Sequence, residues 1–286
     1  MKRTAIVMDS TGYLSSDLIS EYNIKIISLS VNIGDETYKE TELSNSDFFA
    51  MLKRISGSST TSQPSVGSFV ELYKGAFAEG YDEIVSIHLS EKISGTYATA
   101  LMAKELLGMD NIHIFDSGSS ALGLGLLGWA AAEWAEEGLN ANEILSKLTK
   151  LKSTTELYFI VDTLEYLHRG GRIGGASALF GTLLQIKPIL YFNEEGIIDV
   201  YEKVRSKNRA LQRVYSELER ALSSNKPHRI AVIHVAAEEE AKTIAAELDD
   251  KYPGHEIRIF EAGAVIATHV GPAALGLAFH PWPLEV

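Results

Sequence analysis

The sequence has no cysteine and comparatively few basic residues, and both features exclude classes of protein. Among its 286 residues there is no Cys, which rules out disulfide bonds and thiolate catalysis and suits a reducing compartment. Asp and Glu number 38 against 26 Lys and Arg, a formal net charge of −12. Nucleic acids and anionic membranes both repel such a chain, so no general nucleic-acid-binding surface is expected.

Long hydrophobic runs are also missing. The longest apolar stretch, residues 121–132, is too short to span a bilayer. The run "AIVM" that follows "MKRT" stops at Asp9, short of the apolar core of a signal peptide. We therefore expect a cytoplasmic protein without stable membrane insertion.

Motifs for metals and nucleotides are absent or misplaced. The eight histidines show no H-x-x-H or H-E-x-x-H pattern, and no P-loop spacing occurs, so neither a metal nor a cofactor is expected. Gly123, Gly125 and Gly128 spell G-x-G-x-x-G, the dinucleotide fingerprint. However, they lie several residues into a helical pattern rather than in the turn after a strand. We interpret them as small residues that allow close helix packing.

Strands and helices alternate along the first half of the chain. Runs such as "TAIVMD", "EIVSIHLS" and "NIHIF" each precede a helical pattern, which is typical of a parallel sheet covered on both faces. The β-branched residues 24–33 look like one further strand. Near residue 153 the pattern changes to neighbouring strands joined by the turn "EEG". The sequence predicts an α/β protein of two domains: residues 1–153 with a parallel sheet, and a smaller α/β domain, 154–286, with a mixed sheet.

Polar stretches follow three of the predicted strands, as "DSTG", "LSEKISGTY" and "DSGSS". Ligands of open α/β sheets bind beyond the carboxyl ends of the strands. In "ISGTY", Ser94 stands where a helix begins, and Gly95 allows a ligand to approach its backbone N–H. We therefore assign Ser94 and Gly95 to an anion site, whereas "DSGSS" is interpreted mainly as a helix cap.

The segment "STTSQPS", residues 59–65, concentrates five hydroxyl groups without a single charge. A linker, a helix cap and a cradle for a small anion are the competing interpretations. Proline stiffens a linker, and a cap uses only one hydroxyl, so a cradle that includes Thr61 and Ser62 is favoured.

His269 is the one histidine with a functional interpretation, because it stands where a helical stretch breaks at Gly271 and Pro272. It is either an imidazole bonded to a nearby carbonyl or a donor to a bound anion. A serine esterase is a further alternative, with Ser94 as nucleophile and His269 as base. Yet Ser94 lacks a G-x-S-x-G elbow, and no oxyanion-hole motif accompanies it.

Seven motifs together resemble those of the DegV family. They are "MDSTGYLS", "TTSQPSVGSF", "HLSEKISGTYATA", "DTLEYLHRGGRI", "KPIL", "EKVRS" and "ATHVGPAALGLA", in the family's order from the first strand to about ten residues from the C-terminus. "GPAALG" departs from the usual "GPGALG", and "LHRGGRIGG" ends differently from "KKGGRIS". Neither departure touches a proposed carboxylate donor.

This resemblance implies a Rossmann-like N-terminal domain, a smaller C-terminal α/β domain that houses an apolar tunnel, and one long-chain fatty acid between them, such as palmitate, stearate or oleate. The carboxylate would meet Thr61, Ser62, Ser94, the backbone of Gly95, and His269. Such proteins are binding subunits without catalysis of their own, and they present the carboxylate to a separate ATP-dependent fatty acid kinase.

Arg172 and Arg205 match family arginines that lie near the head group or the face that docks the kinase. Arg205 also belongs to a basic cluster with Lys203, Lys207, Arg209 and Arg213. A solvated helix face and a docking surface are equally good interpretations of this cluster.

A third functional class stays open. In the substrate domain of dihydroxyacetone kinase, which has a related fold, a histidine would bind a small ketone on a polar surface. The apolar segment 178–192 mildly favours a tunnel instead, although a core helix and strand would look alike.

Overall fold

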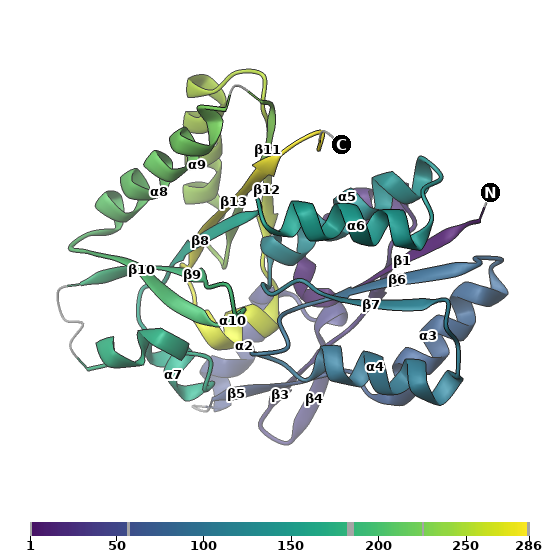
Figure 1. The fold of residues 1–286 in the computed structure, drawn as a ribbon. Coiled ribbons are helices and arrows are strands. Elements are labelled where there is room, and N and C mark those ends of the chain that lie inside the picture. Colours follow the sequence, from purple (N-terminus) through teal and green to yellow (C-terminus); the bar gives the residue numbers. More distant parts are fainter. Residues whose placement is uncertain (1, 56–57, 182–185, 225, 285–286) are drawn as a thin grey trace.

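The computed structural model describes residues 2–55, 58–181, 186–224 and 226–284. Over these residues the strands form a four-stranded, a three-stranded and a six-stranded sheet (Figure 1). The strands of the first two sheets lie between residues 4 and 116, and those of the third between residues 156 and 281. The predicted α/β architecture, with one parallel and one mixed sheet, is confirmed.

The four-stranded sheet is entirely parallel, in the order β2-β1-β6-β7. Helices α3 and α4 pack on one face and α5 and α6 on the other, so every residue of β1 and β6 is buried. This explains the continuous apolar runs of these strands in the sequence. The elements are β1 (Thr4–Asp9), β2 (Lys25–Ile27), β6 (Glu83–His88), β7 (Ile112–Asp116), α3 (Val66–Ala78), α4 (Thr96–Leu107), α5 (Leu122–Glu136) and α6 (Ala141–Lys152).

The three-stranded sheet is antiparallel, in the order β4-β3-β5. Its strands are β3 (Ser30–Ile33), β4 (Glu36–Lys39) and β5 (Ser59–Ser62). The expectation of a single strand over residues 24–33 is wrong, because Ile27 pairs with Asp9 in the parallel sheet whereas Val31 pairs with Thr61 here. The chain changes sheets between β2 and β3, and apolar periodicity alone does not mark that point.

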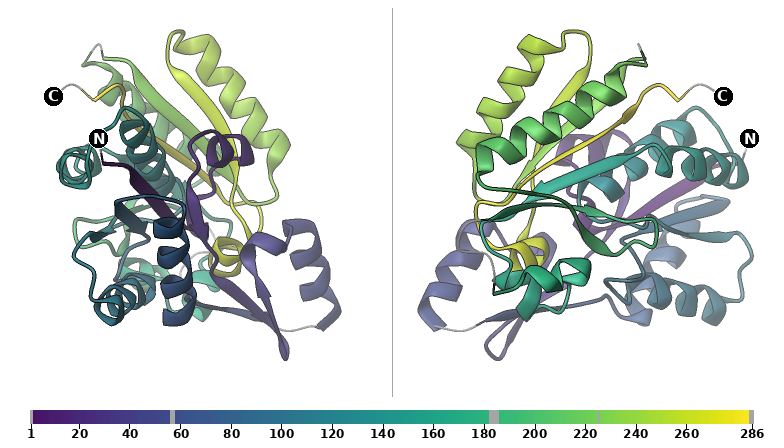
Figure 2. Two further views of the ribbon diagram at one scale, coloured as in Figure 1. Left: turned by 90° about the vertical axis from the view of Figure 1, so that its right-hand side faces the viewer. Right: turned by 60° about the vertical axis from the view of Figure 1, so that its left-hand side comes forward.

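The six-stranded sheet is mixed, in the order β10-β9-β8-β13-β11-β12, and only β11 and β12 run parallel. Helices α8 and α9 cover its outer face (Figure 2), while its inner face is turned toward the first half of the chain. The elements are β8 (Glu156–Ile160), β9 (Lys187–Phe192), β10 (Ile198–Val204), β11 (His228–His234), β12 (Glu256–Glu261), β13 (Leu275–Pro281), α8 (Lys207–Leu222) and α9 (Glu238–Lys251).

The two halves share one hydrophobic core. Helix α10 from the second half packs against β3, β5 and α2 of the first half as well as against α7. One continuous apolar cluster consequently includes Ile6 of β1 and Ile233 of β11. The remaining elements are η1 (Ser10–Gly12), α1 (Ser16–Glu21), η2 (Glu40–Glu42), α2 (Asn45–Ile55), α7 (Glu165–Arg169), η3 (Gly174–Leu179) and α10 (Ala264–Val270).

The three glycines of the G-x-G-x-x-G pattern lie within α5, where they permit close packing. A Cβ on Gly125 would stand 2.2 Å from the carbonyl oxygen of Gly12, and one on Gly128 would stand 2.6 Å from Sδ of Met8. The interpretation of these glycines as packing residues is confirmed. They bring α5 against β1 and the turn that follows it.

Two glycine-to-alanine substitutions within helices should have opposite effects on stability. In Gly125→Ala the new methyl group meets backbone that cannot move aside, so we expect a loss of about 1–3 kcal/mol in the free energy of unfolding. Gly75→Ala in α3 is the control, since nothing lies within 4 Å of its Cβ position. There alanine should stabilise the helix by about 0.5–1 kcal/mol. Urea unfolding of both variants measures the difference, and equal effects would contradict the packing role of Gly125.

Candidate functional site

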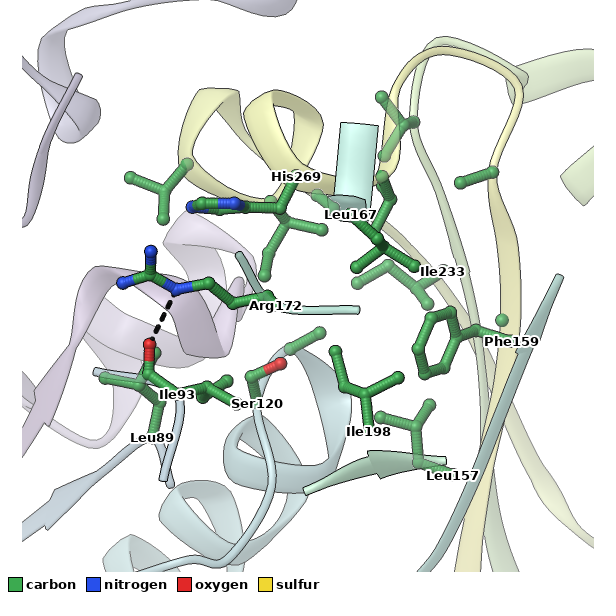
Figure 3. Close-up of a pocket in the computed structure, with 18 of the residues that line it drawn as sticks. Leu89, Ile93, Ser120, Leu157, Phe159, Leu167, Arg172, Ile198, Ile233 and His269 are labelled. Carbon is green, nitrogen blue, oxygen red and sulfur yellow. Dashed lines mark hydrogen bonds between the residues drawn. The ribbon is translucent and has the colours of Figure 1, made fainter. Parts of the chain in front are cut away.

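An apolar cavity lies between the two halves of the chain, and we call it the acyl cavity. It encloses about 800 Å³ of space between protein atoms, its open mouth included. Side chains of the parallel-sheet half form part of the wall, and the inner face of the six-stranded sheet forms much of the rest (Figure 3). The apolar lining includes Leu29, Leu89, Ile93, Leu157, Phe159, Leu167, Phe192, Ile198, Ile233, Val235, Val265, Ile266, Val270 and Leu275.

Besides Ser120 and His234, four polar side chains line the cavity, and they lie close to one another. Thr61, Ser94, Arg172 and His269 all line the cavity, so the structure brings together four of the residues singled out in the sequence. In Figure 3, Arg172 and His269 lie on one side of the cavity and Leu157 and Phe159 on the opposite side. The cavity therefore has a polar end and an apolar end, as an amphiphilic ligand requires.

Strand β5 places Thr61 against the histidine. Its residues alternate between half-buried and exposed, so Ser59 and Thr61 point inward while Thr60 and Ser62 point to solvent. Oγ1 of Thr61 lies 2.9 Å from Nε2 of His269, and Oγ of Ser59 lies 3.0 Å from Oγ1 of Thr268. Ser62 thus lies on the opposite face of the strand and is not part of the cavity wall.

The segment 59–65 therefore has two structural roles besides the cradle. Its first four residues are strand β5, and its last residue, Ser65, caps α3 by accepting the backbone N–H of Ser68 at 3.1 Å. Between them, the amide of Gln63 packs against Gly95, where a Cβ would stand 2.5 Å from Oε1. Gln63 also donates to Oγ1 of Thr99 at 3.2 Å. A side chain at position 95 would therefore require the amide of Gln63 to shift.

Ser94 and Gly95 precede α4, as the sequence predicts. Oγ of Ser94 lies 2.9 Å from Oγ1 of Thr96 and accepts its backbone N–H at 3.3 Å. Gly95 borders a polar recess that Ser94 and Arg172 also line. This recess adjoins the polar end of the acyl cavity, since Ile93, Ser94 and Arg172 belong to both.

Backbone carbonyl groups hold the guanidinium of Arg172 in place. Its Nε donates to the carbonyl of Ile93 at 2.9 Å, and its Nη1 donates to the carbonyl of Gly170 at 2.7 Å. Within the described ranges it forms no ion pair with a carboxylate. A fixed, uncompensated cation at the end of an apolar cavity favours an anionic ligand group.

Arg205 lies elsewhere. It is exposed and borders a separate hollow with Lys203, Arg209 and Arg213, between β10 and α8. Arg213 is bound by Glu202 and Glu217, whereas no ion pair of Arg205 occurs in the described part of the chain. The two arginines grouped together in the sequence analysis thus occupy different surfaces.

The imidazole of His269 is neutral at neutral pH. Burial, with a smaller contribution from the charge of Arg172, lowers the pKa of its imidazole to about 4. Nδ1 is buried and has no hydrogen-bond partner among the described residues. Gly170 makes this position possible, because a Cβ there would stand 2.2 Å from Nδ1. In the sequence, the glycine pair in "HRGGRI" is the feature that corresponds to this contact between Gly170 and His269.

A buried carboxylate of the first half holds the helix that carries His269. Glu40 accepts the N–H of Val265 at 2.9 Å and the hydroxyl of Tyr13 at 2.5 Å, and it also bonds to Ser10. The oxygen of Tyr13 in turn accepts the N–H of Ile266 at 3.2 Å. These contacts satisfy two N–H groups at the start of α10. No sequence motif indicated Glu40.

The arrangement required of an esterase is not formed in the described structure. Nε2 of His269 contacts Thr61 rather than Ser94. Asp9, a possible orienting residue, lies 3.2 Å from Nδ1 of His88, and Asp116 accepts the N–H of Gly118 at 2.9 Å. The apolar lining also differs from the polar surface expected of a small-ketone site.

The comparisons with known proteins identify the family. The model of the DegV family matches residues 3–281. The chain belongs to the DegV family. Protein DegV of Bacillus subtilis is 40% identical over 277 residues, which cover 96% of this chain and 98% of that protein.

Solved structures of DegV proteins have the same fold. The crystal structure of Bacillus subtilis DegV, described as a fatty acid binding protein, has a TM-score of 0.90 and covers 98% of this chain and 100% of that one at 40% identity. A fatty-acid-binding DegV protein of Thermus thermophilus has a TM-score of 0.90 at 32% identity, with 98% and 99% covered. A stearic-acid-binding protein of Eubacterium ventriosum has a TM-score of 0.86 at 25% identity, with 98% of each chain covered.

The Glu40 contacts predict a pH-dependent stability. Burial raises the pKa of Glu40 to about 7, so between about pH 4.5 and 7 the folded protein holds a proton that the unfolded chain releases. Its contribution to the free energy of unfolding therefore decreases as the pH rises through this range, by up to about 3 kcal/mol. Glu40→Gln lacks this titration. Urea unfolding across pH 4.5–8 measures the free energy of unfolding of both proteins. The advantage of wild type over the variant in this free energy should decrease as the pH rises.

Other buried groups do not affect this comparison. The lowered pKa of His269 produces the opposite slope, a loss of stability as the pH falls from about 6.5 to 4, but both proteins share it. Parallel pH profiles for wild type and Glu40→Gln would contradict a titrating Glu40.

Proposed function

We propose that this protein binds one long-chain fatty acid in the acyl cavity, with the carboxylate at Thr61, Ser94, Arg172 and His269. The observation that carries the proposal is an uncompensated arginine beside a hydroxyl–imidazole pair at one end of an apolar cavity. The fatty-acid-binding relatives support it, because they share the fold over nearly the whole chain.

The energetics follow from the two ends of the ligand. Each buried methylene contributes about 0.8 kcal/mol, so the acyl chain supplies most of the affinity. The carboxylate must find hydrogen-bond donors when it leaves water, and it therefore fixes the orientation of the ligand. Arg172 supplies a charged donor, and the neutral hydroxyls add donors without repelling one another.

We further propose that the protein is a carrier without catalysis and presents the carboxylate to a separate ATP-dependent fatty acid kinase in the cytoplasm. Its own wall supplies an anion site, and the chain has no P-loop spacing. Among the described helices, none has the length and apolarity needed to cross a membrane. We also retain the domain division at residue 153 as part of this proposal, with the ligand enclosed by both parts.

The first test is the lipid content of the purified protein. We expect about one fatty acid per chain after denaturation and extraction, identified by mass spectrometry, or uptake of one equivalent of added palmitate or oleate. An empty protein that takes up neither acid would refute the proposed function.

A matched pair of variants on β5 locates the head group in the same assay. Thr61→Val removes a hydroxyl that faces the cavity, and a lost hydrogen bond to a carboxylate should weaken binding about tenfold or more. Thr60→Val is the control, because Thr60 is exposed on the opposite face, where its hydroxyl accepts a hydrogen bond from Asn32 at 3.2 Å. Equal affinities of the two variants would place the carboxylate elsewhere.

The kinase proposal predicts a separation between binding and transfer. Arg205→Ala should leave the fatty-acid affinity unchanged, because Arg205 lies outside the cavity, but it should slow acyl-phosphate formation by a partner kinase. Arg172→Ala should reduce both the fatty-acid affinity and the rate of acyl-phosphate formation. The measurements are fatty-acid affinity by calorimetry and the rate of ATP-dependent phosphorylation. If Arg205→Ala leaves the rate unchanged, this surface does not dock the kinase.

A further inference from the structure

A second cavity lies behind the acyl cavity, and we call it the rear cavity. Leu157 of β8 and Phe192 of β9 line both cavities. The rear cavity is also lined by Phe115, Ser117, Lys152, Thr155, Glu156 and Tyr191. Two side chains therefore belong to the boundary between the cavities.

This boundary is at the end of the acyl cavity away from the carboxylate site. In Figure 3, Leu157 lies across the cavity from Arg172. Leu157 and Phe192 are the residues next to the Tyr158–Tyr191 pair of the β8–β9 ladder, on adjacent strands. The ring of Phe159 lies 6.2 Å from that of Phe192. The terminal methyl group of a ligand anchored at Arg172 would point toward this wall.

A different extension of the cavity is closed by the sheet. Leu275 and Gly276 also line a small enclosed space beneath α8. However, β13 and β8 pair continuously there, with Leu275 opposite Ile160 and Gly276 opposite Phe159. An acyl chain cannot pass through a hydrogen-bonded ladder. Leu157 and Phe192, in contrast, lie beyond Tyr158 and Tyr191, the last residues of the β8–β9 ladder to pair at that end.

The rear cavity is more polar than the acyl cavity. Lys152 enters it and donates to the carbonyl of Asp116 at 2.9 Å, and Glu156, Ser117 and Thr155 add further polar groups. A methylene group that displaced water from these groups would gain much less than one in the apolar cavity. The boundary therefore separates space that favours an acyl chain from space that does not.

We propose that Leu157 and Phe192 set the longest acyl chain that this protein binds well, an inference that rests on the proposed function. Affinity rises about fourfold per methylene until the tail reaches these side chains, and longer tails must displace them. Removing either side chain opens the acyl cavity into the rear cavity beside the apolar rings of Phe115 and Tyr191. Selection by length thus depends on two side chains that do not contact the carboxylate.

The experiment measures affinity for saturated fatty acids of about 14 to 24 carbons in delipidated wild type, Leu157→Ala and Phe192→Leu. Leu167→Ala is the matched control, since it removes the same atoms from the acyl-cavity wall but does not border the rear cavity. We expect the affinity ratio of the longest to the mid-length acids to rise about tenfold or more in the two boundary variants and to stay unchanged in the control. Thermal unfolding shows whether each variant is folded. If Leu157→Ala does not fold, the milder substitution Phe192→Leu tests the inference alone.

The outcomes separate this inference from the function on which it rests. Suppose that wild type binds mid-length acids and the boundary variants keep the same length preference. This result would overturn the inference and leave the proposed function standing. If Leu167→Ala shifts the length preference as strongly, the inference is overturned as well, because any enlargement of the acyl cavity would then favour longer acids. Wild type that binds no acid would overturn both.

Discussion

The proposed carboxylate site depends on a contact between Glu40 in the first half of the chain and the start of α10 in the second. Glu40 and Tyr13 accept two of the free N–H groups at the start of this helix, those of Val265 and Ile266. About one turn further along α10, His269 meets Thr61 of β5. Because α10 has only seven residues, its position is fixed by these end contacts and by apolar packing, rather than by its own helical stability.

The chemistry of the site follows from its burial. Each charge that is enclosed without a partner costs desolvation free energy, so a cluster of several cations would destabilise the empty protein. The structure has one guanidinium, held by the carbonyls of Ile93 and Gly170, next to a histidine whose pKa lies near 4. The other donors are neutral hydroxyls. In the proposed complex a single carboxylate would restore neutrality, and Thr61 is the residue of the segment 59–65 that lines the cavity.

Much of the fold could be predicted from the sequence, because strand periodicity and helix caps are local signals. The alternating first half and the change of pattern near residue 153 were both visible. Sequence reasoning failed where the partner was distant: the break between β2 and β3 depends on which strands Ile27 and Val31 pair with, and Glu40 gains its role from a helix 225 positions away. The strand β5 is a third case, since a hydroxyl-rich run does not indicate that every second side chain, here Thr60 and Ser62, points to solvent; the role expected of Ser62 stays a prediction.

The six-stranded sheet explains why the cavity and the core can be built by the same strands. Along β13, Leu277 and Phe279 face outward to α8 and α9, whereas Gly276 and Ala278 face inward with little or no side chain. The large outward residues provide stability, and the small inward residues leave room opposite Phe159 and Leu157. The space available to a ligand is therefore set by side-chain size on one face of a rigid sheet, which can vary while the fold and the carboxylate site stay the same.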